Sequence, residues 1–312
     1  MRRRAEATPH MTQTIEFLLG MRTSRTGSAY LRATQLEYFL REDLRHLGFS
    51  SSVQVGIRNP SPKTTYFLSK SYIIDHGLNG IAPLASAGHQ VIVDPIDMDL
   101  DTEEGKIAVK YATKLISSAI EQDGYLRSIQ APGQQTFFVP HHVDVRIPPA
   151  AAQQTQFRMA YFGSRLNLLM PRQIRPNGPF RPGGTGCHVY WTEEPRNTTW
   201  IPALQSFSCH YNIRPPRREH IFKPFTKGHI AAHVGAVILG ARSDREAVLN
   251  LGDDYPFLYD INSPGDIVLA VDDIAGAFQS DRWQLAQRRM SGLKAIVDID
   301  NVKKTVLEAI VA

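Results

Sequence analysis

The chain has 312 residues, of which 42% are hydrophobic and 21% are charged, and its 35 Lys and Arg outnumber its 30 Asp and Glu. The length suits one large or two ordinary domains, and the composition suits a packed core, which argues against a disordered protein. No apolar run approaches the ~20 residues of a membrane span. Two cysteines, Cys187 and Cys209, are too few for a disulfide framework or a cysteine-built zinc site.

The first residues are basic but lack the apolar stretch of a secretory signal. Arg2, Arg3 and Arg4 are followed by a mixed polar sequence. We therefore expect a cytoplasmic protein, in which the patterned sequence begins at Thr14.

Strand and helix patterns alternate in the first half of the chain. Such alternation predicts a parallel sheet covered on both faces by helices. The predicted strands are 14–19, 51–57, 65–68, 89–94 and 137–140, and the predicted helices are 29–47, 80–87 and 106–115.

Ligands of such sheets bind beyond the carboxyl ends of the strands. The first of these loops has a single glycine after Gly20, so it is not a dinucleotide-binding fingerprint, which argues against an NAD-dependent enzyme. The rule selects the loop 24–28, the segment 94–97 and the segment 141–144, and their candidate residues are Gly27, Ser28, Asp94, Asp97, His141, His142 and Asp144.

The second half predicts another α/β unit after a proline-led hinge at 148–154. The expected architecture is α/β, with two Rossmann-like domains at 13–147 and 155–312 and a cleft between them; the C-terminal helices are free to pack back on the first domain. The predicted strands are 157–162, 187–191, 206–213, 235–239 and 267–271, the predicted helices are 224–234, 245–251 and most of 272–312, and 177–186 and 214–218 are predicted to be loops.

The positive charge is concentrated in one part of the chain. Residues 156–234 carry a net charge of +8, whereas residues 1–155 carry +1 and residues 235–312 carry −4. This asymmetry indicates an anionic partner, with a solvated basic surface as the alternative.

A candidate phosphate site opens the helix predicted at 224–234. Pro224 suits the first position of a helix, whose N-terminus presents free N–H groups and partial positive charge. Lys223 and Lys227 share one helix face, Thr226 adds a hydroxyl, and Arg214 precedes them. These features predict a site for a phosphate or diphosphate. The alternative is a helix with two exposed lysines.

Several segments resemble the two-Rossmann-domain (GT-B) glycosyltransferases that use nucleotide sugars. They are 27–48, 139–144, 161–164, 223–232 and 235–238, within a diffuse similarity that covers most of residues 14–290. The resemblance implies that the second domain holds a nucleotide sugar and the first holds a hydroxyl acceptor, which is a glycan, a lipid-linked sugar or a small molecule.

The resemblance also implies a reaction without a metal or other cofactor. Arg214, Lys223 and Lys227 are expected to stabilise the leaving diphosphate. Gly163 and Ser164 are expected to let backbone N–H groups approach the phosphates, with an ordinary strand-to-helix turn as the alternative.

The acid–base and ribose-binding residues are less clearly marked. An inverting reaction needs a base on the acceptor hydroxyl, and Asp97 or Asp94 is expected to supply it. His141 and His142 are expected on the acceptor side rather than at a metal. Many retaining members have two glutamates eight positions apart near this helix, and this chain lacks them. The donor ribose therefore has no obvious partner, and the substitutes expected are Asp253 and Asp254.

Two alternatives to a glycosyltransferase follow from these features. A non-catalytic binding or partner subunit of the same fold fits the missing glutamate pair. A nucleic-acid-binding protein fits the overall charge, but the basic stretch lacks interleaved aromatic residues, so we expect no nucleic acid partner. Peripheral membrane contact is expected only if the acceptor is lipid-linked.

Overall fold

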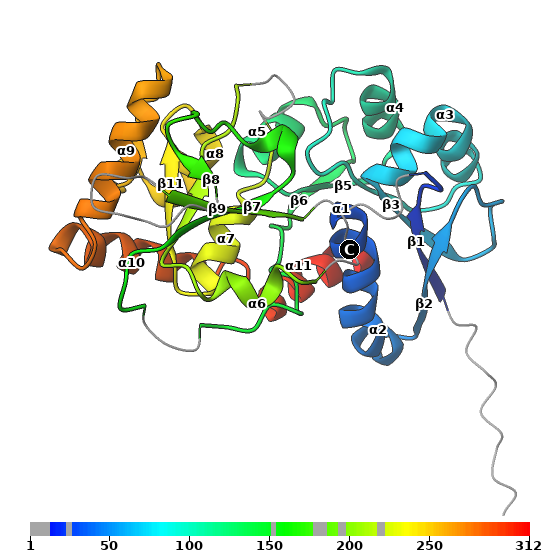
Figure 1. Cartoon of the computed structure of the whole chain (residues 1–312). Helices are drawn as coiled ribbons and strands as arrows, with labels where there is room; N and C mark the ends of the chain where they lie inside the picture. The colour runs from blue at the N-terminus through cyan, green and yellow to red at the C-terminus, as the bar shows by residue number, and fades with distance from the viewer. Residues whose placement is uncertain (1–12, 23–26, 151–153, 177–185, 193–197, 217–221) are drawn as a thin grey trace, which may run out of the picture.

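The computed structural model describes residues 13–22, 27–150, 154–176, 186–192, 198–216 and 222–312. Within them lie two six-stranded parallel sheets, which define a first and a second domain side by side (Figure 1). The first sheet has the order β2-β1-β3-β4-β5-β6, with β1 Gln13–Leu19, β2 Phe49–Val55, β3 Thr64–Ser69, β4 Val91–Asp94, β5 Lys114–Ser117 and β6 Gln135–Phe138.

Both faces of the first sheet are covered because its strands are apolar on both sides. Successive side chains of a strand point to opposite faces. Phe17 of β1 accordingly packs with the cluster beneath α2, whereas its neighbour Leu18 packs with the cluster beneath α3. The helices of this domain are α1 Gly27–Ala29, continued by a π-helical segment Tyr30–Gln35 and α2 Leu36–His46, then α3 Lys70–Ser86, α4 Glu103–Tyr111 and α5 Ile120–Ile129.

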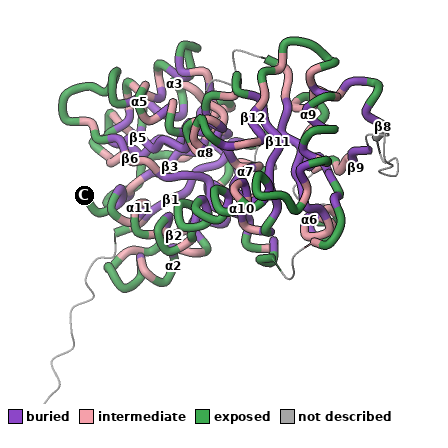
Figure 2. The backbone as a smooth tube through the Cα atoms, turned by 90° about the vertical axis from the view of Figure 1, so that its left-hand side faces the viewer, coloured by how far each residue is buried: buried purple, intermediate pink, exposed green. Residues whose placement is uncertain are grey.

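The second sheet has the order β12-β11-β10-β7-β9-β8. Its strands β7, β10 and β11 are buried along their whole length, and Figure 2 shows the outer faces of the helices exposed. Its strands are β7 Met159–Gly163, β8 Arg175–Pro176, β9 Gly186–Trp191, β10 Cys209–Asn212, β11 Val237–Ala241 and β12 Leu258–Tyr259. Its helices are the 3₁₀ turn Arg165–Asn167, α6 Ile201–Leu204, α7 Thr226–His233, α8 Arg245–Leu251, α9 Pro264–Gly276 and α10 Asp281–Leu293.

The last helix, α11 Ile299–Val311, returns to the first domain (Figure 1). Val302 and Val306 are buried there in one cluster with Leu36 and Leu40 of α2. The chain therefore crosses between the sheets twice. The boundaries 13–147 and 155–312 stay a prediction.

The structure confirms the α/β fold class and most predicted elements, but several were wrong. Residues 114–117 form β5, whereas the predicted helix 106–115 runs into them. Helix α5 was not predicted, and 267–271 lies inside α9 rather than in a strand. Residues 177–185 and 217–221, in the two predicted loops, lie outside the described residues.

Among the described residues, no helix has the length and apolar composition needed to cross a membrane.

Candidate functional site

A cleft of about 420 Å³ lies between the carboxyl ends of the two sheets. The chain reverses its winding direction between β1 and β3 in the first sheet, and between β7 and β10 in the second. Open α/β sheets bind ligands beyond the strand ends at such points. Each domain thus supplies one wall of a single cleft.

Eleven of the predicted site residues line this cleft. On the first-domain wall they are Gly27, Ser28, Asp97, His141 and Asp144, and on the second-domain wall they are Gly163, Ser164, Arg214, Lys223, Thr226 and Lys227. Asp94, His142, Asp253 and Asp254 do not line it.

Helix α7 meets the cleft without a cap of its own. Thr226 is its first residue, and no described side chain caps its first turn. Pro224, Phe225 and Lys227 line the same stretch of wall. Such a helix end favours anions, because its N–H groups are unsatisfied and the helix dipole is positive there.

Lys227 is the second residue of this helix. Its Nζ lies 3.9 Å from the centroid of the Tyr161 ring, and no carboxylate among the described residues pairs with it. Burial lowers the pKa of Lys227 well below its usual value, and repulsion from Arg214 and Lys223 lowers it further, against a smaller opposing effect of Asp244. An anionic ligand in the cleft would supply the missing negative charge.

Gly163 leaves the space that Lys227 occupies. A Cβ at position 163 would lie 3.1 Å from Lys227 Cε and 2.7 Å from the Tyr161 hydroxyl oxygen. Ser164 follows at the end of β7, and its Oγ lies 2.9 Å from Asn167 Nδ2. A methyl group at this position would therefore crowd the Tyr161 and Lys227 side chains.

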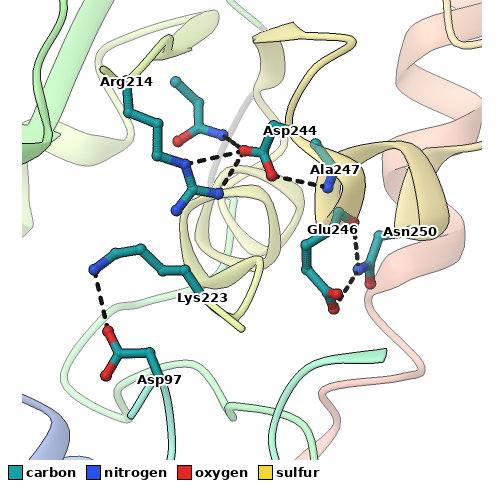
Figure 3. Close-up of polar contacts among 8 residues, drawn as sticks. Asp97, Arg214, Lys223, Asp244, Glu246, Ala247 and Asn250 are labelled. Atoms are coloured by element: carbon teal, nitrogen blue, oxygen red, sulfur yellow. Dashed lines mark hydrogen bonds and ion pairs between the residues drawn. The ribbon is translucent and has the colours of Figure 1, made fainter. Parts of the chain in front are cut away.

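Arg214 follows β10 and is held by Asp244. Its Nε and Nη2 lie 3.1 and 2.5 Å from Asp244 Oδ2 (Figure 3). The other oxygen, Oδ1, accepts from the backbone N–H of Ala247 at 3.3 Å, which makes Asp244 the N-cap of α8. One carboxylate therefore caps a helix and fixes a guanidinium at the cleft.

Lys223 reaches across the cleft to the first domain. Its Nζ lies 3.2 Å from Asp97 Oδ2, and Lys70 Nζ lies 2.5 Å from Asp97 Oδ1. Burial alone would raise the pKa of Asp97, but the two lysines lower it well below its usual value. Asp97 is therefore an ionised anchor for Lys223 and a weak proton acceptor.

Asp94 lies beneath the cleft. It is fully buried, and its Oδ2 is 2.7 Å from Nε of the equally buried Arg32, whose Nη1 donates to the Pro140 carbonyl at 3.0 Å. Burial raises the pKa of Asp94, and Arg32 opposes that rise. The predicted base is thus out of reach of a substrate, and its role is to hold Arg32.

The two histidines have different surroundings. His141 lines the cleft, and none of the described groups hydrogen-bonds to its Nδ1. His142 lies behind it, with Nε2 3.0 Å from Gln35 Oε1. Burial lowers the pKa of His142 to about 3 and that of His141 well below its usual value, so both rings are neutral near pH 7.

No family model and no curated protein matches the sequence. Solved structures do match over nearly the whole chain. HepE of Anabaena, solved with UDP and glucose, has a TM-score of 0.64 and 10% identity, covering 96% of this chain and 99% of that one. Sucrose-phosphate synthase of Thermosynechococcus elongatus has a TM-score of 0.57 and 10% identity, covering 95% and 100%. An alpha-glucosyltransferase solved with UDP and a 13-mer DNA has a TM-score of 0.53 and 9% identity, covering 96% and 100%.

This chain has the GT-B fold. Two parallel α/β domains facing each other across one cleft are the architecture that the resemblance predicted.

Two acidic residues expected at the donor side of this GT-B cleft lie elsewhere. Asp254 pairs with Arg289 at the exposed surface, and the carbonyl of Asp253 accepts from Arg242 Nη1 at 2.9 Å. Neither contacts the cleft, so neither is in a position to bind a donor there.

Polar residues that the sequence interpretation missed line a second cavity of about 180 Å³ beside the cleft. Asn212 and Arg214 line both spaces, and Asp244 and Glu246 belong to the second. Asp244 precedes a predicted helix, which is a helix-start signal that could have identified it. No group of three or more His, Cys, Asp or Glu among the described residues is placed to hold a metal ion.

Proposed function

We propose that this chain transfers a sugar from a nucleoside-diphosphate sugar to a hydroxyl acceptor. One observation carries the proposal: Arg214, Lys223 and Lys227 meet at the uncapped start of α7, and Lys227 has no carboxylate partner among the described residues. A diphosphate has the charge and the acceptor oxygens that this wall lacks. Neighbours of the same fold solved with UDP or UDP-glucose support this ligand class.

The same three cations would stabilise the leaving group. In the transfer, the acceptor oxygen bonds to the anomeric carbon, the bond from that carbon to the diphosphate oxygen breaks, and the proton of the acceptor hydroxyl passes to the departing nucleoside diphosphate. Negative charge builds on the diphosphate, and fixed cations lower the barrier because they need no reorganisation. We therefore propose a reaction that requires no metal or other cofactor.

The first-domain wall is the proposed acceptor side. Gly27, Ser28 and His141 line it, together with Asp97 from the segment that follows β4. Asp97 keeps its place as the catalytic candidate, but its ion pairs favour electrostatic positioning over proton removal. Because the side-chain cations Arg214, Lys223 and Lys227 act on the leaving group, we expect transfer to depend more on them than on a strong base.

A glycan, a lipid-linked sugar or a small hydroxyl compound is the proposed acceptor. One neighbour was solved with DNA, so a hydroxyl-bearing DNA belongs among the acceptors tested. We propose a cytoplasmic location, with membrane contact only for a lipid-linked acceptor.

A non-catalytic partner subunit is the second candidate. It is favoured by the pairing of both carboxylates that line the cleft, since Asp97 is bound to two lysines and Asp144 to Arg146. Such pairing leaves no described carboxylate at the cleft with a pKa suited to proton transfer.

Two measurements separate these functions. We expect a nucleoside diphosphate to raise the melting temperature, because a ligand of the folded state stabilises it. We then expect the matching nucleotide sugar to release its nucleoside diphosphate, slowly to water and faster with the acceptor. Stabilisation without any turnover would favour the partner subunit, and the absence of stabilisation by any nucleotide would remove donor binding.

A further inference from the structure

Helix α5 of the first domain begins without a cap from its own domain. The preceding residue is Ala119, and no side chain of the segment bonds to the first N–H groups of Ile120–Ile129. Alanine is a poor N-cap because it offers no acceptor, and the first N–H groups of any helix have no partner within it.

Glu246 of the second domain supplies the missing acceptors. Its Oε1 accepts from the backbone N–H of Ile120 at 2.8 Å, and its Oε2 accepts from the N–H of Glu121 at 3.2 Å. Asn250 Nδ2 donates to Oε1 at 3.2 Å (Figure 3). The carboxylate is 3% exposed and meets three N–H donors, which are the partners that a buried charge requires.

Glu246 belongs to the short helix α8, which also positions residues of the proposed diphosphate site. Two residues before Glu246, Asp244 caps α8 and holds Arg214 (Figure 3). One turn after Glu246, Asn250 Oδ1 lies 3.3 Å from Nε2 of the buried His229, which belongs to α7. Helix α8 therefore binds the first domain, an arginine of the cleft and the helix of Lys227 at once.

We propose that Glu246 is a positioning residue that sets the spacing of the two cleft walls by capping α5 across the domain boundary. For its effect on catalysis, this inference rests on the proposed function. Other contacts between described residues of the two domains include the Asp97–Lys223 pair, the Tyr125–Phe222 ring pair with centroids 5.2 Å apart, and an Arg245–Glu121 pair at 2.8 Å. The Arg245 side chain is 75% exposed, so its pair with Glu121 adds little.

The test compares Glu246→Gln with the unsubstituted chain. Glutamine keeps the size of the side chain, so no cavity forms, but it turns an amide NH₂ towards N–H donors. Spin labels at Ser86→Cys on α3 and Ser291→Cys on α10 report the distance between the domains, since both positions are exposed. Burial raises the pKa of Cys187 and Cys209, so the native thiols resist labelling.

We expect Glu246→Gln to lengthen and broaden the interdomain distance in the unliganded protein. Arg245→Ala, which breaks only the exposed pair, is expected to leave it unchanged. Melting curves and circular dichroism confirm that both variants are folded. The proposal is overturned if Glu246→Gln has the distance distribution of the unsubstituted protein, or if Arg245→Ala changes it equally.

UDP binding and kinetics provide the functional readout. We expect the apparent Kd for UDP to rise in inverse proportion to the fraction of molecules at the short distance. We also expect the donor KM to rise more than kcat falls, whereas partial unfolding would lower kcat alone. If the interdomain distance lengthens in Glu246→Gln but the unsubstituted protein binds no nucleotide, the role of Glu246 as a cap is supported and the proposed function is rejected. Normal UDP binding with an unchanged distance would do the reverse.

Discussion

The two walls of the cleft differ in how their charges are balanced. On the first-domain side, each described carboxylate that lines the cleft has a cation: Asp97 has Lys70 and Asp144 has Arg146, and beneath the wall the buried Asp94 is paired with Arg32. On the second-domain side, Arg214 and Lys223 have carboxylates but Lys227 has none among the described residues.

This difference separates structural charge from charge available to a ligand. The two charges of the buried Arg32–Asp94 pair neutralise each other, and the pair stabilises the first domain. On the second-domain wall, Lys227 has no carboxylate partner and the start of α7 has no side-chain cap among the described residues, so an anion is stabilised there. The net charge of +8 over residues 156–234 therefore points to a local anion site rather than to a general affinity for polyanions.

The largest effect is expected from breaking the first-domain pair. Arg32→Ala leaves the buried Asp94 without its cation, and losing one partner of a buried pair costs about 3–5 kcal/mol. Urea unfolding measures the loss. Arg45→Ala, which removes an exposed partner of Glu42, is the matched control and should change stability by less than ~0.5 kcal/mol. Equal losses in both variants would contradict a structural role for the buried pair.

Adding a methyl group at position 163 tests the second-domain wall directly. Gly163→Ala places a Cβ 2.7 Å from the Tyr161 hydroxyl oxygen and 3.1 Å from Lys227 Cε, so we expect both side chains to shift. We expect nucleoside diphosphate affinity to fall about tenfold, or ~1.4 kcal/mol, measured by calorimetry. Gly292→Ala on α10, where a Cβ meets nothing within 4 Å, should keep full affinity. Unchanged binding in Gly163→Ala would separate Lys227 from the ligand.

Asp97→Asn tests whether the first-domain wall contributes a base. The low pKa of Asp97 predicts an anchoring role, so we expect kcat to fall about tenfold or less, against the ~10²–10⁴-fold expected for loss of a general base. Single-turnover rates with saturating donor measure the chemical step. A thousandfold loss would restore Asp97 as the base.

The smallest expected effect is the uptake of less than one proton per site when the diphosphate binds. The pKa of Lys227, which is ordinarily 10.5, is lowered in the free cleft. We expect a bound diphosphate to raise it again. Between these two pKa values binding therefore takes up protons, less than one per site. Calorimetry at a series of pH values below 10.5, in two buffers of different ionisation enthalpy at each pH, measures this uptake. The proton uptake should vanish in Lys227→Met. If the apparent binding enthalpy of the unsubstituted protein is the same in both buffers, binding takes up no proton and the lowered Lys227 pKa is contradicted.

Periodicity and helix-end signals predicted much of the fold. The apolar spacing of 29–47 and the start of α7 after Pro224 were visible in the sequence. Strand β5 was missed because four residues buried on both faces have no strand periodicity. The stretch 267–271 was assigned to a strand, although Ser263 and Pro264 mark a helix start with a capping box.

The site was predictable where chemistry follows local sequence. Lys223 and Lys227 could be placed on one helix end from spacing alone. The partners of Asp97 could not, because Lys223 lies 126 positions away in the chain. The cap provided by Glu246 is likewise invisible in sequence, since its acceptors matter only when α5 of the other domain is packed against α8.

The central claim is that Lys227 completes an anion site for a nucleoside diphosphate. Its most direct test is a calorimetric titration of Lys227→Ala with the nucleoside diphosphate that most stabilises the unsubstituted protein, beside Lys294→Ala at an exposed position on the same domain. Losing a charge-assisted contact predicts about a 10- to 100-fold weaker Kd in Lys227→Ala and no change in Lys294→Ala. Equal affinity in the two variants would contradict the account.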